Sequence, residues 1–222
     1  MSSAPKPPPP RSTYRHGDLR RALLEAGVEL ARAGGPEAVV LREATRRAGV
    51  APNAAYRHFD SRQALLYAVR SAALAAVARA MEAELAAVPP DLPPADFARA
   101  NVRAVGASYL RFAQTESGLF RTAFGPSDDL KERGQGTPAN AERKGQSGLD
   151  PFELLGAALD KLVSADVLPP ERRPGAEFLA WSAVHGLAML VIDGPLGPIL
   201  GPQMQKTGER LVEMVEKGLC GK

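Results

Sequence analysis

The chain has 222 residues, of which 45% are hydrophobic and 24% charged, and a formal net charge of +3; this balance is typical of a globular protein with a buried core. Its single cysteine, Cys220, excludes an internal disulfide framework and suits a reducing compartment. Because uninterrupted apolar runs such as Leu187–Ile192 are too short to cross a bilayer, and residues 1–11 lack the apolar segment of a secretory signal, we expect a cytoplasmic protein without a membrane partner.

The composition predicts an all-α fold, since alanine is abundant, runs of β-branched residues are scarce and no long stretch alternates apolar with polar residues. The charge is unevenly distributed. Residues 1–70 contain twelve Lys or Arg and six Asp or Glu, giving +6; the whole chain carries +3, so the remainder carries −3. A basic N-terminal part on a slightly acidic body is typical of a protein that binds a polyanion at one end, although a merely solvated basic surface gives the same count.

Residues 1–15 are rich in proline and are expected to form a flexible arm. A helix is predicted over His16–Ala33, because apolar residues recur there at steps of three or four. The stripe that this spacing produces consists of Leu19, Leu23, Ala26 and Leu30.

Two short helices joined by a tight turn are predicted next. The first covers Leu41–Ala48 and ends at Gly49, and the second starts at Pro52 and runs to about Phe59. Ser61 then caps a third helix. This is the helix-turn-helix arrangement, whose second helix fits the major groove of DNA.

The rest of the chain is predicted to be helical as well, apart from a flexible, glycine-rich loop over 125–148. Glycines alternating with prolines between Gly194 and Pro202 predict a turn-rich interruption. The predicted helices are Ser61–Ala87, Ala95–Gln114, Ser117–Phe124, Pro151–Asp166, Pro174–Asp193 and Gln203–Leu219.

In the helix-turn-helix region the sequence resembles the TetR family of bacterial transcriptional regulators. The matching positions are Arg20–Val39, Arg42-Glu43, Ala48-Gly49-Val50, Tyr56-Arg57-His58-Phe59, Arg62 and Leu65-Leu66. Two departures stand out. Val40 replaces the usual Ser or Thr helix cap, which is worth about 1 kcal/mol, and Ala44-Thr45 replaces a bulky apolar residue followed by alanine, which is expected to loosen the packing.

The resemblance implies a DNA-binding domain over 16–67 and an effector-binding and dimerisation domain over 68–222. It also implies that double-stranded DNA, as a palindromic operator, is the partner. Phosphate contacts are expected from Tyr56, His58 and Arg62, and groove contacts from Arg42, Pro52, Asn53, Ala54 and Arg57. The chemistry agrees, since Asn suits adenine, Arg suits guanine and Tyr hydroxyls suit phosphate oxygens. The alternative is that Tyr56 and His58 only stabilise the fold of this domain.

A second resemblance lies in the C-terminal part. Ser108–Phe124, followed by Trp181 and the pair His185-Gly186, is similar to a TetR C-terminal subfamily of Trp-His-Gly (WHG) type. We therefore expect a pocket for a small apolar or aromatic effector; the alternative for each of these side chains is an ordinary core position. The candidate pocket residues are Phe97, Tyr109, Phe112, Phe120, Phe124, Trp181, His185 and Met189.

The terminal helix carries an apolar stripe that needs a partner, and a two-fold pairing of subunits would cover it. The chain is accordingly expected to be a homodimer. The candidate interface residues are Leu211, Met214, Val215, Gly218 and Leu219.

No enzyme, metal site or cofactor is expected, because three histidines and one cysteine form no ligand set and no glycine-rich phosphate loop is present. The sequence thus predicts a regulator, most simply a repressor released by an effector. Two alternatives stay open: a DNA-binding regulator whose body only dimerises or binds a protein, and a helical carrier or enzyme with a degenerate head.

Overall fold

The computed structural model describes residues 16–125 and 141–221, and these residues form helices and connecting turns without a strand. The predicted arm 1–15 and the greater part of the predicted loop, 126–140, lie outside the described residues. The all-α prediction is confirmed for the described part. The helices are α1 (His16–Gly34), η1 (Pro36–Ala38), α2 (Leu41–Ala48), α3 (Pro52–Ala55), α4 (Arg62–Ala86), α5 (Pro94–Thr115), α6 (Ser117–Phe124), η4 (Ala141–Arg143), α7 (Pro151–Ser164), η5 (Pro170–Arg172), α8 (Ala176–Ile192), α9 (Gly197–Leu200), η6 (Gly201–Gln203) and α10 (Met204–Cys220).

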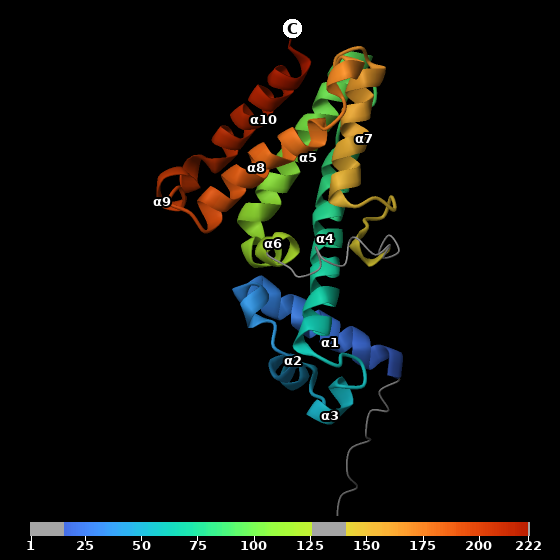
Figure 1. Ribbon diagram of the computed structural model, residues 1–222, viewed down its shortest axis with the longest axis vertical. Helices are drawn as coiled ribbons and strands as arrows, with labels where there is room; N and C mark the ends of the chain where they lie inside the picture. Colours follow the sequence, from blue (N-terminus) through green and yellow to red (C-terminus); the bar gives the residue numbers. More distant parts are fainter. Residues whose placement is uncertain (1–15, 126–140, 222) are drawn as a thin grey trace, which may run out of the picture.

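Helices α1–α3 form a small unit at one end of the molecule, which we call the head, while α5–α10 form the larger body at the other end (Figure 1). The long helix α4 starts in the head and runs the length of the body. Helix α6 is the part of the body nearest the head and contacts α1 and α4. The expected domain boundary after Tyr67 therefore falls inside a continuous helix.

The head is built around the predicted apolar stripe of α1, which is buried. Helix α2 has the predicted bounds. Its N-cap, Val40, makes no side-chain cap hydrogen bond, and its C-cap, Gly49, has the left-handed φ of 68° that glycine adopts readily. The predicted loosening at Ala44-Thr45 is not seen: both residues are buried, and the Thr45 hydroxyl donates to the backbone carbonyl of Arg42 at 2.7 Å.

The second helix of the motif is shorter than predicted. The prediction of a helix to Phe59 is wrong, because α3 ends at Ala55 and the chain continues as a turn. In that turn the amides of His58 and Phe59 donate to the carbonyl of Ala55, each at 2.9 Å. Phe59 is 3% exposed and packs into the core, which draws the chain inward after a single helical turn.

Helix α4 begins at the predicted cap, where the Ser61 hydroxyl accepts from the amide of Ala64 at 3.0 Å. By length and composition, α4 is the one described helix that could cross a bilayer. Looking only for uninterrupted apolar runs in the sequence does not detect it. Its most apolar window is 61% buried among the other helices, however, as expected for a core helix.

The part of the predicted flexible loop that follows residue 140 is hydrogen-bonded to α4. The carboxylate of Glu82, on α4, accepts from the amides of Gln146 and Ser147 at 2.9 and 2.8 Å and from the Ser147 hydroxyl at 2.6 Å. Residues 146 and 147 of the predicted loop are therefore held to α4 by a carboxylate distant in sequence.

The remaining helices are close to the predicted positions. Helix α6 has the predicted bounds, and α7 starts with a capping box between Asp150 and Glu153. The predicted interruption contains a short helix, α9, followed by η6. Helix α10 packs on α5. The two helices are close at Gly106, where an added Cβ would lie 2.7 Å from Cγ2 of Val212.

Candidate functional site

The turn that follows α3 presents polar and basic side chains at the end of the head. Asn53, Tyr56 and Arg57 are exposed, Tyr56 by 57%, while Ala55 and Phe59 point into the core. This alternation follows from the one-turn helix, which places every fourth residue on the inner side. Asn53, Tyr56 and Arg57 therefore lie on the outer surface of the head, where they are available to contact a ligand.

Arg42 on α2 and Arg57 after α3 are the unpaired cations of this surface. Within the described ranges, neither side chain has a hydrogen-bond or ion-pair partner, and both are exposed. By contrast, Arg46 and Arg47 are paired with Glu43 on the same helix, at 2.6 and 3.4 Å. The hydrogen bond and charge of Arg46 lower the pKa of Glu43 to about 2, so its carboxylate stays ionised.

The structure gives Arg62 a role inside the head. Its Nε donates to the carbonyl of Val39 at 2.8 Å and its Nη2 to the carbonyl of Pro36 at 2.7 Å. These bonds tie the start of α4 to the segment before α2. A phosphate contact from Arg62 is then left with Nη1 alone. Of the other expected contacts, Ala54 and His58 are half-buried, and Pro52 begins α3.

The junction between head and body depends on residues that the sequence reasoning missed. A Cβ at Gly118 on α6 would lie 2.3 Å from the carbonyl oxygen of Ala31 and 2.4 Å from that of Arg32. Arg32 also pairs with Glu116 at 2.8 Å, so α1 and α6 meet through both a backbone contact and an ion pair. The glycine within an otherwise ordinary amphipathic segment was the available signal.

Five of the eight expected pocket residues come together between α5, α6 and α8. Their ring centroids lie 4.9–6.4 Å apart, and we call this group the aromatic cluster: Tyr109, Phe120, Phe124, Trp181 and His185. Tyr109 and Phe120 are buried, whereas Phe124, Trp181 and His185 are half-buried. The cluster therefore has an inner wall and an outer, accessible side.

A hydrogen-bond chain runs through the cluster. The Trp181 indole N–H donates to the Tyr109 oxygen at 3.0 Å, and that hydroxyl lies 2.8 Å from Nδ1 of His185. Burial raises the pKa of the Tyr109 hydroxyl well above its ordinary value and lowers that of His185. Both groups are therefore uncharged at neutral pH.

The other three expected pocket residues lie apart from the cluster's ring contacts. Phe97 is half-buried near the start of α5, under the ammonium of Lys161 at 5.3 Å, and it lies outside the aromatic cluster. Phe112 is buried in the core, and Met189 packs against the core from α8. Helical spacing alone did not show which neighbours each of these three side chains meets.

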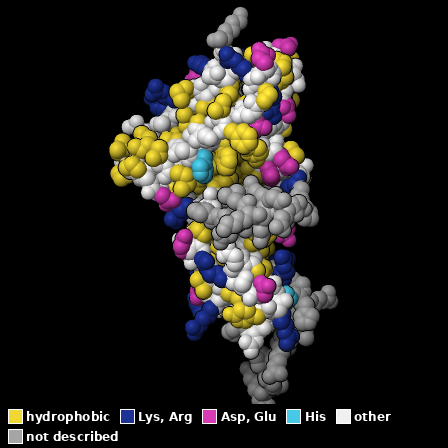
Figure 2. All heavy atoms as spheres, viewed as in Figure 1, with side chains coloured by type: hydrophobic (Ala, Val, Ile, Leu, Met, Phe, Trp, Pro, Cys, Tyr) yellow, Lys and Arg dark blue, Asp and Glu magenta, His cyan; other side chains and the backbone are white. Residues whose placement is uncertain are grey.

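The expected dimer face is partly open. Met214 is 63% exposed, Gly218 is exposed, and Leu211 and Val215 are half-buried, whereas Leu219 is 7% exposed and faces the body's own core. Among the expected interface residues, Leu219 is thus the one that the subunit's own core covers. Hydrophobic side chains also gather over α8 and α9 (Figure 2). The large exposed ones there are Phe178, Leu179, Leu190 and Ile199.

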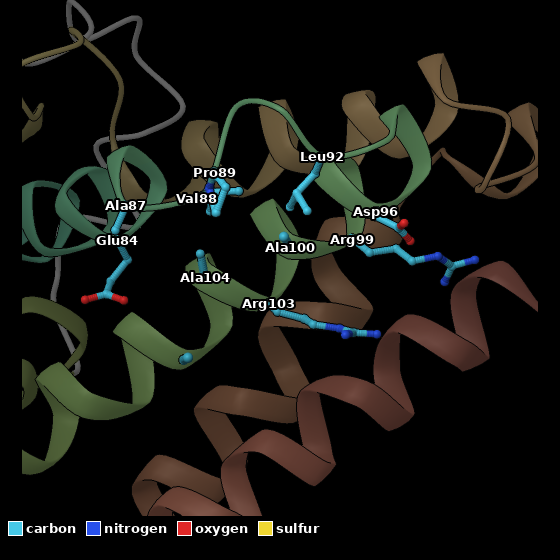
Figure 3. A pocket seen from close by; sticks show the side chains of 11 residues that line it. Glu84, Ala87, Val88, Pro89, Leu92, Asp96, Arg99, Ala100, Arg103 and Ala104 are labelled. Atoms are coloured by element: carbon cyan, nitrogen blue, oxygen red, sulfur yellow. The ribbon is translucent and has the colours of Figure 1, made fainter.

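A shallow groove of about 640 Å³ lies where α4 turns into α5, and it contains none of the expected pocket residues (Figure 3). Its floor is made of small apolar side chains such as Ala100 and Ala104. Arg99 and Arg103 extend from its edge toward α10, where both pair with the buried carboxylate of Glu216. The arginines thus hold α10 on α5.

No group of three His, Cys, Asp or Glu side chains placed to hold a metal ion occurs among the described residues. A protruding basic turn on a small three-helix head, carried on a larger helical body, defines the class of helix-turn-helix DNA-binding regulators.

The family models agree. Residues 23–69 match the model of bacterial regulatory proteins of the tetR family, and residues 102–215, just over half of the chain, match a tetracyclin repressor-like C-terminal domain. The chain belongs to the TetR family and is a DNA-binding transcriptional regulator. Neither match is described as the WHG type, so that detail of the prediction is not confirmed.

Solved structures show the same fold. A protein of unknown function from Rhodococcus sp. RHA1 is 23% identical, with a TM-score of 0.70, covering 95% of this chain and 100% of that one. A putative TetR-family transcriptional regulator from Mesorhizobium loti MAFF303099 is 13% identical, with a TM-score of 0.63 and coverages of 91% and 96%. The TetR family transcriptional regulator PfmR from Thermus thermophilus is 19% identical, with a TM-score of 0.56 and coverages of 89% and 98%. Comparison with curated proteins gives no match.

Proposed function

We propose that this regulator is a cytoplasmic homodimeric repressor, which binds a palindromic operator through its two heads and is released by a small apolar or aromatic effector. The observation that carries the DNA contact is the exposed turn after α3. Arg42, Asn53 and Arg57 contact base edges, Tyr56 and His58 contact phosphates, and Pro52 and Ala54 lie along the groove wall. Arg62 supports this surface from within the head.

The proposed dimer forms through the apolar face of α8–α10. Large exposed apolar side chains on these helices support this pairing, since contiguous apolar surface on a protein commonly marks an interface. A two-fold pairing places two identical heads on two half-sites, which accounts for a palindromic operator.

The proposed effector binds at the aromatic cluster and favours a body whose heads no longer match the operator spacing. A coupling free energy of about 1–3 kcal/mol changes operator affinity by about 5–150-fold. One observation favours a second candidate function. Tyr109 and Phe120 are 2% and 0% exposed, which suits a body that responds to no effector and serves only for dimerisation.

The test of DNA recognition is selection of bound duplexes from a random pool with the full-length protein, followed by affinity measurements at several salt concentrations. An enriched palindrome is expected, with binding that weakens as salt rises because phosphate contacts release counterions. A non-palindromic motif would contradict the proposed two-headed binding. Absence of any enriched motif would contradict sequence-specific binding altogether.

A further inference from the structure

The donor and the acceptor of each hydrogen bond in the series Trp181, Tyr109 and His185 can be assigned. An indole N–H can only donate, so the oxygen of Tyr109 accepts from Trp181. Tyr109 is 2% exposed, and the other partner of its hydroxyl among the described residues is Nδ1 of His185. The phenolic proton therefore points at Nδ1, which must be the acceptor.

It follows that the neutral ring of His185 carries its proton on Nε2. No hydrogen-bond partner for Nε2 occurs in the part of the chain that the structure describes. Nor is Nε2 among the fully buried nitrogens that lack a partner. The chain of hydrogen bonds thus ends in a donor that reaches accessible space.

Among the described residues, the surroundings of this donor are aromatic and uncharged. The ring of His185 stacks on Phe120 at 5.8 Å and 28°, and meets Phe124 and Trp181 at 5.7 and 5.6 Å. Burial lowers the pKa of His185, and no charged group of the described residues contributes to the shift. A charged ligand would lose its hydration here without gaining an opposite charge, and that loss is costly.

We propose that Nε2–H of His185 recognises a hydrogen-bond acceptor, such as a ketone or ester oxygen, on an uncharged aromatic effector held against Phe124 and Trp181. This inference rests on the proposed effector-responsive function and adds the chemical class and orientation of the ligand. Trp181 and Tyr109 act as positioning residues, since they keep the proton on Nε2 and the ring in place.

The first test measures the tautomer in the full-length protein. Long-range ¹H–¹⁵N correlation of the ¹⁵N-labelled imidazole of His185 is expected to show a proton on Nε2 and none on Nδ1 near neutral pH. In Tyr109→Phe the hydroxyl that fixes this state is missing, and a mixture of tautomers is expected. A proton on Nδ1 in the unaltered protein would overturn the inference.

The second test compares two probes of similar shape, 2-acetylnaphthalene and 2-ethylnaphthalene, by calorimetric titration. Fluorescence of Trp181, the one tryptophan of the chain, gives an independent readout. The ketone is expected to bind about fivefold more tightly, because it alone accepts a hydrogen bond. Equal affinities for the two probes, or no binding of either, would refute the proposed recognition.

Variants then assign the preference to one atom. His185→Met removes the donor at similar volume and is expected to abolish the preference, while His185→Gln, which keeps a side-chain N–H, retains part of it. Phe97→Leu lies outside the cluster and serves as the matched control, with the preference unchanged. Preference that persists in His185→Met would exclude His185 as the donor.

The same preparations are tested for duplex binding, so that two failures can be told apart. Loss of the ketone preference with intact operator binding refutes the ligand assignment and leaves the DNA-binding function standing. A ketone preference without binding to any duplex refutes the proposed operator function instead.

Discussion

Two arginines close together in the chain have different tasks. Arg57 is exposed with no partner among the described residues, whereas Arg62 donates to two backbone carbonyls of the head. The first arrangement leaves a guanidinium available to a ligand, and the second uses most of one for structure. Residue type alone does not separate these roles.

Replacing each arginine by alanine distinguishes them. Arg57→Ala is expected to weaken operator binding by about 1–3 kcal/mol without changing the free energy of unfolding. Arg62→Ala is expected to lower the free energy of unfolding by about 1–2 kcal/mol, because two charge-assisted hydrogen bonds are lost at a partly solvated site. Urea titration and duplex binding on both variants give the comparison. Equal effects on stability would contradict the assignment.

His185 also predicts a pH dependence. Its pKa is lowered below the ordinary 6.5 by burial, so below that pH the unfolded chain binds a proton that the folded protein does not. The free energy of unfolding is therefore expected to fall as the pH drops below about 6.5, and the His185 contribution is constant above it. Urea titrations of the unaltered protein and His185→Gln across about pH 5–8 isolate this term. A difference between the two that does not change with pH would contradict it.

Among the helices, the contact between α6 and α1 depends on the missing side chain of Gly118. A methyl group there meets backbone carbonyl oxygens of Ala31 and Arg32 at 2.3 and 2.4 Å, and backbone cannot move aside as a flexible side chain can. Helix α6 is thereby one of the elements through which the body touches the head.

Gly118→Ala is expected to lower the free energy of unfolding by about 1–3 kcal/mol, as overpacking does. Gly156→Ala on α7 is the matched control. Its Cβ has the nearest described atom, Nη2 of Arg173, at an ordinary 3.6 Å, so alanine is expected to stabilise by about 0.5–1 kcal/mol. Thermal unfolding of both variants measures the difference. A neutral Gly118→Ala would show that the junction relaxes freely.

The pairing of α5 with α10 is asymmetric. The carboxylate of Glu216 is 1% exposed, whereas the side chains of Arg99 and Arg103 are 36% and 53% exposed. Removing Glu216 lets both arginines return to water, but removing the arginines leaves a buried charge. The double variant Arg99→Leu/Arg103→Leu is expected to cost about 3–5 kcal/mol and Glu216→Gln clearly less, as measured by urea titration. The reverse order would contradict this reading of the triad.

In the molecule as a whole, the head lies at the start of α4 and the body lies along the rest of that helix, with α6 nearest the head (Figure 1). Helices α4 and α6 therefore connect the body to the head. The large exposed apolar side chains of α8–α10 are on the body, away from the head, where pairing leaves the DNA surface free.

Met214→Glu tests this pairing, because Met214 is 63% exposed and a charge there costs the single subunit little. A monomer is expected by analytical ultracentrifugation, with affinity for the palindrome reduced about 100-fold or more as bivalent binding is lost. Gln114→Glu on α5, exposed and outside the α8–α10 face, is the control and keeps the dimer. A dimer that survives Met214→Glu would place the interface elsewhere.

The order of the amino acids was enough to predict the helix ends that local chemistry sets. Gly49, Ser61 and the pair Asp150–Glu153 act within one turn of the backbone, so the bounds of α2 and the starts of α4 and α7 follow from neighbouring residues. The family was equally accessible, since its motif is local.

Only the folded structure shows which residues that are distant in the sequence contact each other. The carbonyl partners of Arg62 lie 23 and 26 positions away, and the histidine partner of Tyr109 lies 76 positions away. The sequence likewise could not show that Phe97 lies outside the aromatic cluster or that the side chain of Leu219 faces the core of the body. Helical spacing fixes which face of a helix is apolar, but the packing of whole helices fixes what that face touches.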